Sequence, residues 1–345
     1  MLRLVCISYE DNTVKNMNKD NLPVLAVDIG GTKIIAALIN SDGNIEARVR
    51  TPTGAAGGKD ASLSNLFLAI DNVLNTGGHK LDEIHSISIA AAGAIDMAKG
   101  VVTASPNLPG WFDVPLLALV RERYQVDSYL LNDAKAAALA EHDFGAGKGI
   151  KNMIFLTIST GIGGGIIIDD RLYFGKSGVA GELGHMTVEA SGPRCLCGNT
   201  GCMEIMASGR AIALNARSRV EKGAKSIMLE LAGGNIENIT AETVSEAAQK
   251  TDAVALEVVN RAAFYLGVGM ANIANIFNPG MIVAGGGVSK MGELLLSPVR
   301  LVVRERAFRL AADDMLIVEA KFGDDAGVIG AASYAYSLTV RSPLS

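Results

Sequence analysis

The chain has 345 residues, of which 31 are Lys or Arg and 36 are Asp or Glu, so its formal net charge is −5. This mildly acidic balance, with no basic block, argues against a nucleic-acid-binding protein. Hydrophobic residues make up 49% of the chain, which is enough for a buried core, and the length is typical of two domains. The 39 glycines are an excess, and glycine is used where backbone turns tightly or approaches a ligand.

The N-terminal segment carries no targeting signal. Residues 1–8 are mildly apolar, but charged residues follow at once and no small-residue cleavage site is present. The longest apolar stretch, near 153–168, is broken by glycines and hydroxyl residues and is typical of core strands. We therefore expect a cytoplasmic protein with no membrane partner, and we expect residues 1–22 to be a disordered extension.

The first half of the chain alternates short apolar strands with helices. A Gly-rich turn at 29–32 separates the first two strands, and residues 41–44 are typical of a hairpin turn. The predicted strands lie at 24–28, 34–39, 45–50, 84–92 and 129–131, and the predicted helices at 61–74 and 134–142.

The same succession restarts about 130 residues later. A strand at 152–157 is followed by a Gly-rich turn at 159–164, a strand at 165–168 and a hairpin into 171–174. This repeat predicts two α/β domains of related topology that face each other, each presenting a Gly-rich turn to a shared cleft. Beyond the repeat, helices are predicted at 205–221, 243–249, 253–277, 293–308 and from 326, with strands at 281–284 and 315–318.

The first Gly-rich turn has the composition of a phosphate-binding turn. Asp28 ends a buried strand, and Gly30, Gly31, Thr32 and Lys33 follow it. Glycines let backbone N–H groups reach phosphate oxygens, and the threonine hydroxyl can donate one more hydrogen bond. The carboxylate of Asp28 can hold Mg²⁺, through water. A plain hairpin turn with a capping aspartate is the competing interpretation.

The second Gly-rich turn offers the same groups, glycines and a threonine hydroxyl, from the second half of the chain. Thr160, Gly161 and Gly163 belong to it, and an ordinary flexible turn is the alternative. Its place in the repeat strengthens the phosphate-binding interpretation of both turns.

The pair Asn132 and Asp133 lies between a short strand and an Ala-rich helix. Aspartate is a favoured helix N-cap, which is the simpler explanation. A carboxylate at a strand end on a cleft is also well placed to accept a hydroxyl proton during phosphoryl transfer, with Asn132 orienting the substrate. The pair alone favours the cap.

Three cysteines and a histidine have metal-ligand spacing: His185, Cys195, Cys197 and Cys202. A Cys₃His set is typical of tetrahedral structural zinc, and four protein ligands leave no open position for catalysis. A redox disulfide or ordinary buried thiols are the alternatives. The remaining cysteine, Cys6, is unassigned.

Acidic residues flank this zinc motif. If zinc pins the segment, Glu182, His185 and Glu204 converge near one point, where the carboxylates could accept hydrogen bonds from sugar hydroxyls. Helix capping and solvent exposure are the simpler explanations for both acids.

Together these motifs resemble the ROK family of bacterial sugar kinases over roughly residues 24–336. The resemblance rests on the segments 26–33, 132–133, 159–165, 181–185 and 195–204. It implies an actin/hexokinase-like fold, with two ribonuclease-H-like domains, ATP in the cleft between them, and a last helix that packs back on the N-terminal domain. The expected division is 23–138 plus 324–345 for the smaller domain and 139–323 for the larger, zinc-bearing one.

The resemblance also implies roles for single residues. Asp133 becomes the catalytic base, and Asn132, Glu182, His185 and Glu204 become sugar ligands. His185 is expected to serve zinc with one ring nitrogen and face the sugar with the other. Gly285 and Gly286 resemble the loop on the adenosine side, and a homodimer or homotetramer is expected.

Three functions follow from the resemblance. An ATP-dependent glucose kinase is favoured because the segments 106–111 and 181–185 look more like those of glucokinases; Asn107 could then contact a sugar hydroxyl, or simply form the turn before Pro109. A kinase for N-acetylmannosamine or N-acetylglucosamine is the alternative. A sugar-responsive transcriptional regulator is less favoured, because only 23 residues precede the first strand and they show no helix-turn-helix pattern.

Overall fold

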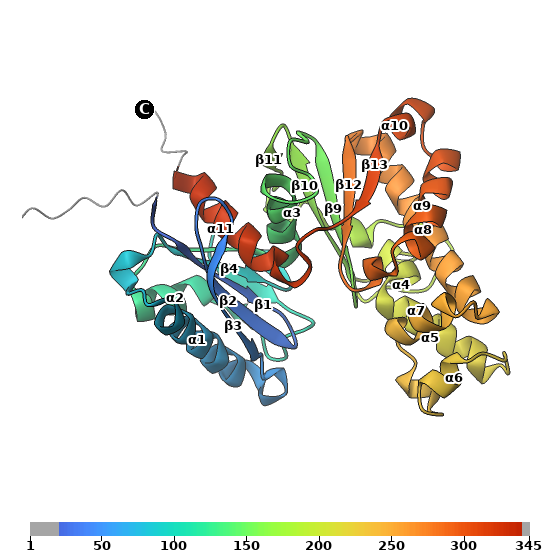
Figure 1. The fold of residues 1–345 in the computed structure, drawn as a ribbon, viewed down its shortest axis with the longest axis horizontal. Coiled ribbons are helices and arrows are strands. Elements are labelled where there is room, and N and C mark those ends of the chain that lie inside the picture. The colour runs from blue at the N-terminus through green and yellow to red at the C-terminus, as the bar shows by residue number, and fades with distance from the viewer. Residues whose placement is uncertain (1–20, 340–345) are drawn as a thin grey trace, which may run out of the picture.

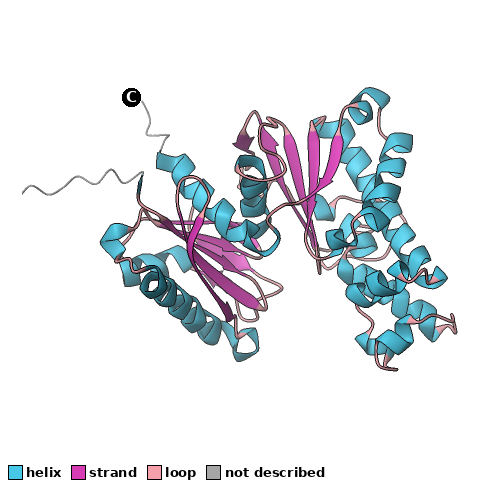
Figure 2. Cartoon of the chain, in the orientation of Figure 1, coloured by secondary structure: helices cyan, strands magenta, loops and turns pink. Residues whose placement is uncertain are grey.

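The structure is a computed structural model that describes residues 21–339. Two mixed sheets, each flanked by helices, lie side by side (Figures 1 and 2). Cys6 and all but the last two residues of the predicted extension lie outside the described residues. Leu22, which was assigned to that extension, is buried, and its carbonyl accepts a hydrogen bond of 2.9 Å from the Tyr336 hydroxyl. The fold therefore includes Leu22.

The first sheet has five strands in the order β3-β2-β1-β4-β8. β1 pairs antiparallel with β2 and parallel with β4, which in turn pairs parallel with β8. The elements of this half are β1 (Val24–Ile29), β2 (Lys33–Ile39), β3 (Ile45–Pro52), α1 (Gly58–Gly77), β4 (Ile87–Ala91), β5 (Ala94–Asp96), β6 (Val101–Ala104), β7 (Phe112–Val114), α2 (Leu116–Tyr124), β8 (Ser128–Asn132) and α3 (Asp133–Asp143).

The second sheet repeats this order as β11-β10-β9-β12-β13, with the same succession of antiparallel and parallel pairs. The predicted repeat is thereby confirmed. The elements of this half are β9 (Met153–Ile158), β10 (Ile162–Ile168), β11 (Arg171–Leu172), α4 (Met203–Ala207), α5 (Gly209–Glu221), α6 (Met228–Leu231), α7 (Ala241–Gln249), α8 (Ala253–Phe277), β12 (Met281–Gly285), α9 (Glu293–Arg306), α10 (Arg309–Asp313), β13 (Leu316–Glu319) and α11 (Ala326–Thr339).

The central strands are buried on both faces, which explains their nearly continuous apolar sequences. In β1, Leu25 and Val27 pack with α1 and α2, whereas Val24 and Ala26 pack with α3 and α11. Alternate residues of the second sheet pack against α3 and α11 on one side and against α4, α5, α7, α8 and α9 on the other. The helices α3 and α11 thus lie between the two sheets (Figure 1).

Helix α8 is the one described helix whose length and hydropathy would let it cross a membrane. Half of its most apolar window is buried. Its inward residues, such as Val259, Leu266 and Ile273, belong to the largest apolar cluster of the molecule. It is therefore placed as a core helix.

Several predicted elements were wrong in detail. Residues 205–221 form two helices because Ser208 has an extended backbone and caps α5 by accepting a hydrogen bond of 3.3 Å from Ala211 N. β10 begins at Ile162, three residues earlier than predicted, and β11 ends at Leu172. The small sheet β5-β6-β7 and the helix α2 were not predicted, since their short segments show no clear period.

The chain crosses from one sheet to the other at two places, after α3 and before α11. Glu141, near the end of α3, is fully buried and ties them together. Its carboxylate accepts hydrogen bonds from Ala146 N (2.9 Å) at the first crossing and from Lys321 N (2.8 Å) and Phe322 N (2.9 Å) at the second.

Candidate functional site

Two carboxylates gather where the parallel strands of the first sheet end. Asp28 lies near the end of β1, and Asp133 is the first residue of α3, directly after β8. Burial, and then the negative charge of Asp133, raise the pKa of Asp28 to about 7. Burial raises the pKa of Asp133 to about 6, although hydrogen bonding from Ala134 N–H opposes the shift. Strand order thus brings together two acids that resist ionisation.

The N-cap of α3 is Asn132, one residue before the aspartate favoured by the sequence. Its Oδ1 accepts hydrogen bonds from Ala134 N (3.0 Å) and Lys135 N (3.3 Å), and its Nδ2 donates to Gly93 O (3.2 Å). Asp133 Oδ1 also accepts from Ala134 N, at 2.8 Å, and the backbone N–H of Asp133 itself is the other described donor to this carboxylate. Because the cap is provided by its neighbour, no other side chain among the described residues bonds the Asp133 carboxylate.

The first Gly-rich turn joins β1 to β2 and is held closely. Gly30 N donates to Lys33 O at 3.1 Å, and the Thr53 hydroxyl donates to Gly30 O at 2.6 Å. A Cβ atom on Gly31 would lie 2.6 Å from Asn107 O, so only glycine fits against the loop that carries Asn107. Thr32 is exposed at the tip of the turn. The structure therefore brings Asn107 to the first turn.

The returning helix α11 packs against this end of the first sheet, in contacts that the sequence did not predict in detail. A Cβ on Gly327, in its first turn, would lie 2.5 Å from the Asp28 carboxylate carbon. Lys33 Nζ forms an ion pair of 2.6 Å with Asp324, just before that helix, and this bond lowers the pKa of Asp324. Lys33 thus joins the first turn to the start of α11, and no signal local to either segment indicates this contact.

The second Gly-rich turn joins β9 to β10 and rests on Glu204. The Glu204 carboxylate accepts a hydrogen bond of 2.9 Å from Ile162 N, and a Cβ on Gly161 would lie 2.4 Å from that carboxylate. Gly161 and the neighbouring Thr160 lie in the turn, but Gly163 lies inside β10, where a Cβ would be 3.0 Å from Ala134 Cβ. The later glycines of this motif therefore allow close packing of α3.

The loop after β12 meets the same edge of the second sheet. Gly285 is the last residue of β12, and Gly286 has φ +89°. A Cβ on Gly286 would lie 2.4 Å from Ile158 O, at the end of β9. A glycine is required here both by conformation and by this close approach.

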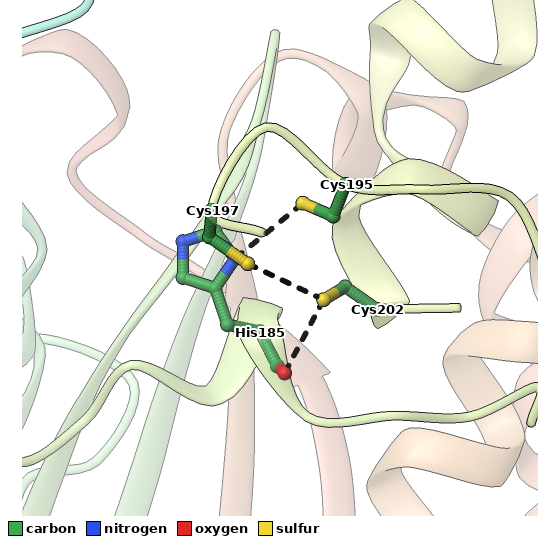
Figure 3. Close-up of side chains that lie close together, drawn as sticks. All are labelled: His185, Cys195, Cys197 and Cys202. Atoms are coloured by element: carbon green, nitrogen blue, oxygen red, sulfur yellow. Dashed lines mark hydrogen bonds between the residues drawn. The ribbon is translucent and has the colours of Figure 1, made fainter. Parts of the chain in front are cut away.

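The predicted metal ligands converge (Figure 3). One ligand atom from each of His185, Cys195, Cys197 and Cys202 lies within 4.8 Å of every other. The sulfur atoms of Cys197 and Cys202 are 3.7 Å apart, and Cys195 Sγ lies 3.8 Å from His185 Nδ1. Tetrahedral zinc with Zn–S bonds of about 2.3 Å requires sulfur atoms about 3.8 Å apart. Number, type and spacing of the donors fit zinc.

His185 faces two ways. Its Nδ1 points to the thiols, and its Nε2 lies 3.9 Å from a carboxylate oxygen of Glu182. Glu182 itself is exposed, with a side-chain accessibility of 56%. The cysteine cluster therefore lies beside Glu182, through His185, and Glu204 follows Cys202 by two residues, so both acids flank the cluster.

The chain is similar to known proteins over most of its length. The model of the ROK family matches residues 24–337. A glucokinase of Halalkalibacterium halodurans is 40% identical over 308 residues, covering 89% of this chain and 92% of that protein. The crystal structure of a Streptomyces griseus ROK family glucokinase in complex with glucose and AMPPNP has 35% identity and a TM-score of 0.80, covering 91% of this chain and 99% of that one.

The same fold also serves regulators. A ROK family transcriptional regulator described as a homologue of the E. coli MLC protein has 28% identity and a TM-score of 0.81, covering 92% of this chain and 79% of that one. The duplicated sheets, the matches to solved structures and the family model together establish the actin/hexokinase-like fold. On this evidence the chain belongs to the ROK family.

Proposed function

We propose that the protein is an ATP-dependent hexose kinase that phosphorylates the 6-hydroxyl of glucose, with Asp133 as general base. The observation that carries the proposal is the state of Asp133: it is the first residue of α3, its carboxylate is bonded by backbone N–H groups alone among the described residues, and burial raises its pKa to about 6. A base with a pKa slightly below neutral is ionised at pH 7 and still accepts a proton readily. The glucokinase relatives favour glucose as the hexose.

In the proposed reaction, Asp133 Oδ2 accepts the proton of the primary hydroxyl while that oxygen attacks the γ-phosphorus of ATP. A new P–O bond forms to the sugar, and the bond to the bridging oxygen breaks, releasing ADP. We propose that backbone N–H groups of the two turns, at Gly31, Thr32, Thr160 and Gly161, bind the phosphate oxygens. The Gly30 N–H is already bonded to Lys33 O, so Gly30 contributes to the shape of the first turn.

Other residues complete the nucleotide site. We assign the adenosine side to the loop at Gly285 and Gly286, and we assign Lys33 to the first turn through its bond to Asp324. Asp28 offers carboxylate oxygens of the kind that Mg²⁺ prefers, and Mg²⁺ would supply charge neutralisation of the phosphates. Gly163 lies inside β10 and not in the turn, so we assign it an indirect role, in which it allows α3 to pack closely against that strand.

The sugar is proposed to bind next to Asp133. Asn132 Nδ2 and Glu182 carboxylate oxygens suit sugar hydroxyls, as do His185 Nε2, Glu204 and Asn107. The Cys₃His cluster is proposed to hold a structural zinc ion that fixes the segment from 182 to 204. We further propose a cytoplasmic homodimer or homotetramer. Its two domains are proposed as residues 23–138 plus 324–345, of which 340–345 lie outside the described residues, and residues 139–323, although the boundary at 138 falls inside α3 and the chain crosses between the sheets after that helix.

The test is an ADP-release assay on glucose, mannose, N-acetylglucosamine and N-acetylmannosamine. We expect the highest kcat/KM for glucose, and comparable kcat/KM for an acetylated sugar would move the assignment to an N-acetylhexosamine kinase. Asp133→Asn should lower kcat by at least a hundredfold while glucose still binds. Asp82→Asn, the same change at an exposed site, is the matched control. Near-normal kcat in Asp133→Asn would remove Asp133 as the base.

A further inference from the structure

Lys135, the third residue of α3, is a lysine buried beside the proposed sugar site. It is 3% exposed, although lysine is rarely buried without a direct partner. Burial lowers the pKa of its ammonium, and the charges of Glu182 and then Asp133 oppose that shift. The cation therefore lies within electrostatic range of the proposed base and of one proposed sugar ligand.

The ammonium of Lys135 has hydrogen-bonding capacity to spare. Its backbone N–H bonds Asn132 Oδ1 at 3.3 Å, but among residues 21–339 no hydrogen bond or ion pair engages its Nζ. An ammonium group carries three donors. Leaving all three unused at such a buried position costs free energy, unless a ligand or a neighbouring carboxylate engages them in the working enzyme.

Lys135 lines a small cavity of about 10 Å³, together with Asn132, Met97 and Glu182. A space of this size holds about one water molecule or one hydroxyl group. Two of its lining residues, Asn132 and Glu182, are proposed sugar ligands. The cavity therefore lies between the buried cation and two of the proposed sugar ligands.

The negative charges of Glu182 and Asp133 favour a cation at the position of Lys135. Glu182 adds to the rise in the pKa of Asp133, because its negative charge disfavours a second negative charge on the buried carboxylate. Lys33, whose positive charge opposes the rise in the pKa of Asp28, is already paired with Asp324 at 2.6 Å. The Glu182 side chain has one close described partner, His185 Nε2 at 3.9 Å, and is otherwise free to turn into solvent.

We propose that Lys135 is a positioning residue of the sugar site: its ammonium, acting across the cavity, holds the Glu182 carboxylate toward the bound hexose. The inference rests on the proposed function and names how that site keeps its shape. Because Lys135 acts through Glu182, its loss weakens sugar binding more than it slows phosphoryl transfer, and it leaves nucleotide binding unchanged.

The experiment compares Lys135→Met, Lys135→Arg and Lys148→Met with the parent. Lys148 is exposed and without a described side-chain partner, so its replacement controls for loss of a positive charge. Glucose affinity is measured by calorimetry without nucleotide, and KM for glucose, KM for ATP and kcat are measured by ADP release. Lys135→Met should raise the glucose Kd and KM about tenfold, with the KM for ATP and the zinc content within twofold of the parent.

Lys135→Arg keeps the charge and should recover most of the glucose affinity. A glucose Kd within twofold of the parent in Lys135→Met would overturn the proposal, as would an equal loss of ATP binding, which would indicate a merely structural lysine. If Lys135→Met does not fold, Lys135→Gln is used with the same criteria. A parent that binds glucose without phosphorylating any hexose would contradict the proposed function alone, since the calorimetric comparison still judges Lys135.

Discussion

The raised pKa of Asp133 predicts an acid limb in the pH profile of the enzyme. Burial shifts this pKa from 3.8 to about 6. The reactive form is the carboxylate, so activity is lost as the pH falls through the folded-state pKa. With a pKa of about 6, about 91% of the base is ionised at pH 7 and about 9% at pH 5, a tenfold drop in kcat/KM for glucose. With a pKa of 3.8 the same change in pH would alter the rate by less than about a tenth.

The assay measures ADP release at several pH values between 5 and 8.5, with Mg-ATP saturating so that titration of Asp28 in the empty nucleotide site does not contribute. Parallel incubation at each pH followed by assay at pH 7.5 excludes irreversible unfolding. Asp82→Asn should give the same pH profile as the parent, because the Asp82 carboxylate is exposed and belongs to none of the motifs assigned to the site. A kcat/KM that is flat from pH 5 to pH 8 would refute the argument that Asp133 is both desolvated and the base.

Three further predictions concern the framework around the site. Treatment with a chelator should release about one zinc ion per chain and weaken glucose binding more than ATP binding, because Glu182 and Glu204 flank the zinc ligands. Metal analysis and calorimetry measure these two effects, and a protein that loses no metal would contradict the prediction. Gly330→Ala should lower the free energy of unfolding, measured with denaturant, by about 1–3 kcal/mol or more. The new Cβ would lie 1.6 Å from Ala136 O, where α11 crosses α3. The control is Gly287→Ala, whose Cβ would meet open space. Glu141→Gln should lower the free energy of unfolding by about 1–3 kcal/mol, because an amide has one acceptor oxygen for three N–H donors. The control Glu122→Gln, at an exposed position, should change it by less than about 0.5 kcal/mol, and an equally small change in Glu141→Gln would argue against this role of Glu141.

The strands and their repeat could be predicted because their signal is local. A strand such as 24–29 is buried on both faces, so its apolar run stands out from the polar turns that bound it. The strands of the β5-β6-β7 sheet are three or four residues long and mix exposed with buried positions, so they leave no such run. The break at Ser208 was missed because the apolar period continues through it.

The site could be predicted only as a set of segments. Cys195, Cys197 and Cys202 lie close in sequence, so their convergence with His185 follows from spacing. The contact of Gly327 with Asp28 joins the two ends of the fold, and no local pattern encodes it. Likewise, the Ala-rich sequence around Lys135 indicates a helix without indicating which of its residues point inward; burial of that lysine emerges only when α3 is packed between the sheets.

The two crossings of the chain explain why α3 and α11 dominate the geometry of the site. Asp133 begins α3 and Glu141 lies near its end, so one rigid helix connects the proposed base to the point where both crossings meet. At the other end, Asp324 and Gly327 bring the start of α11 against the first turn and Asp28. A rotation of one sheet relative to the other must therefore pivot near Glu141 or break its hydrogen bonds. Such a pivot would change the separation of the two Gly-rich turns but would leave Asp133 in place beside Asn132. A kinase whose two domains close on its substrates needs a base that is already positioned before closure.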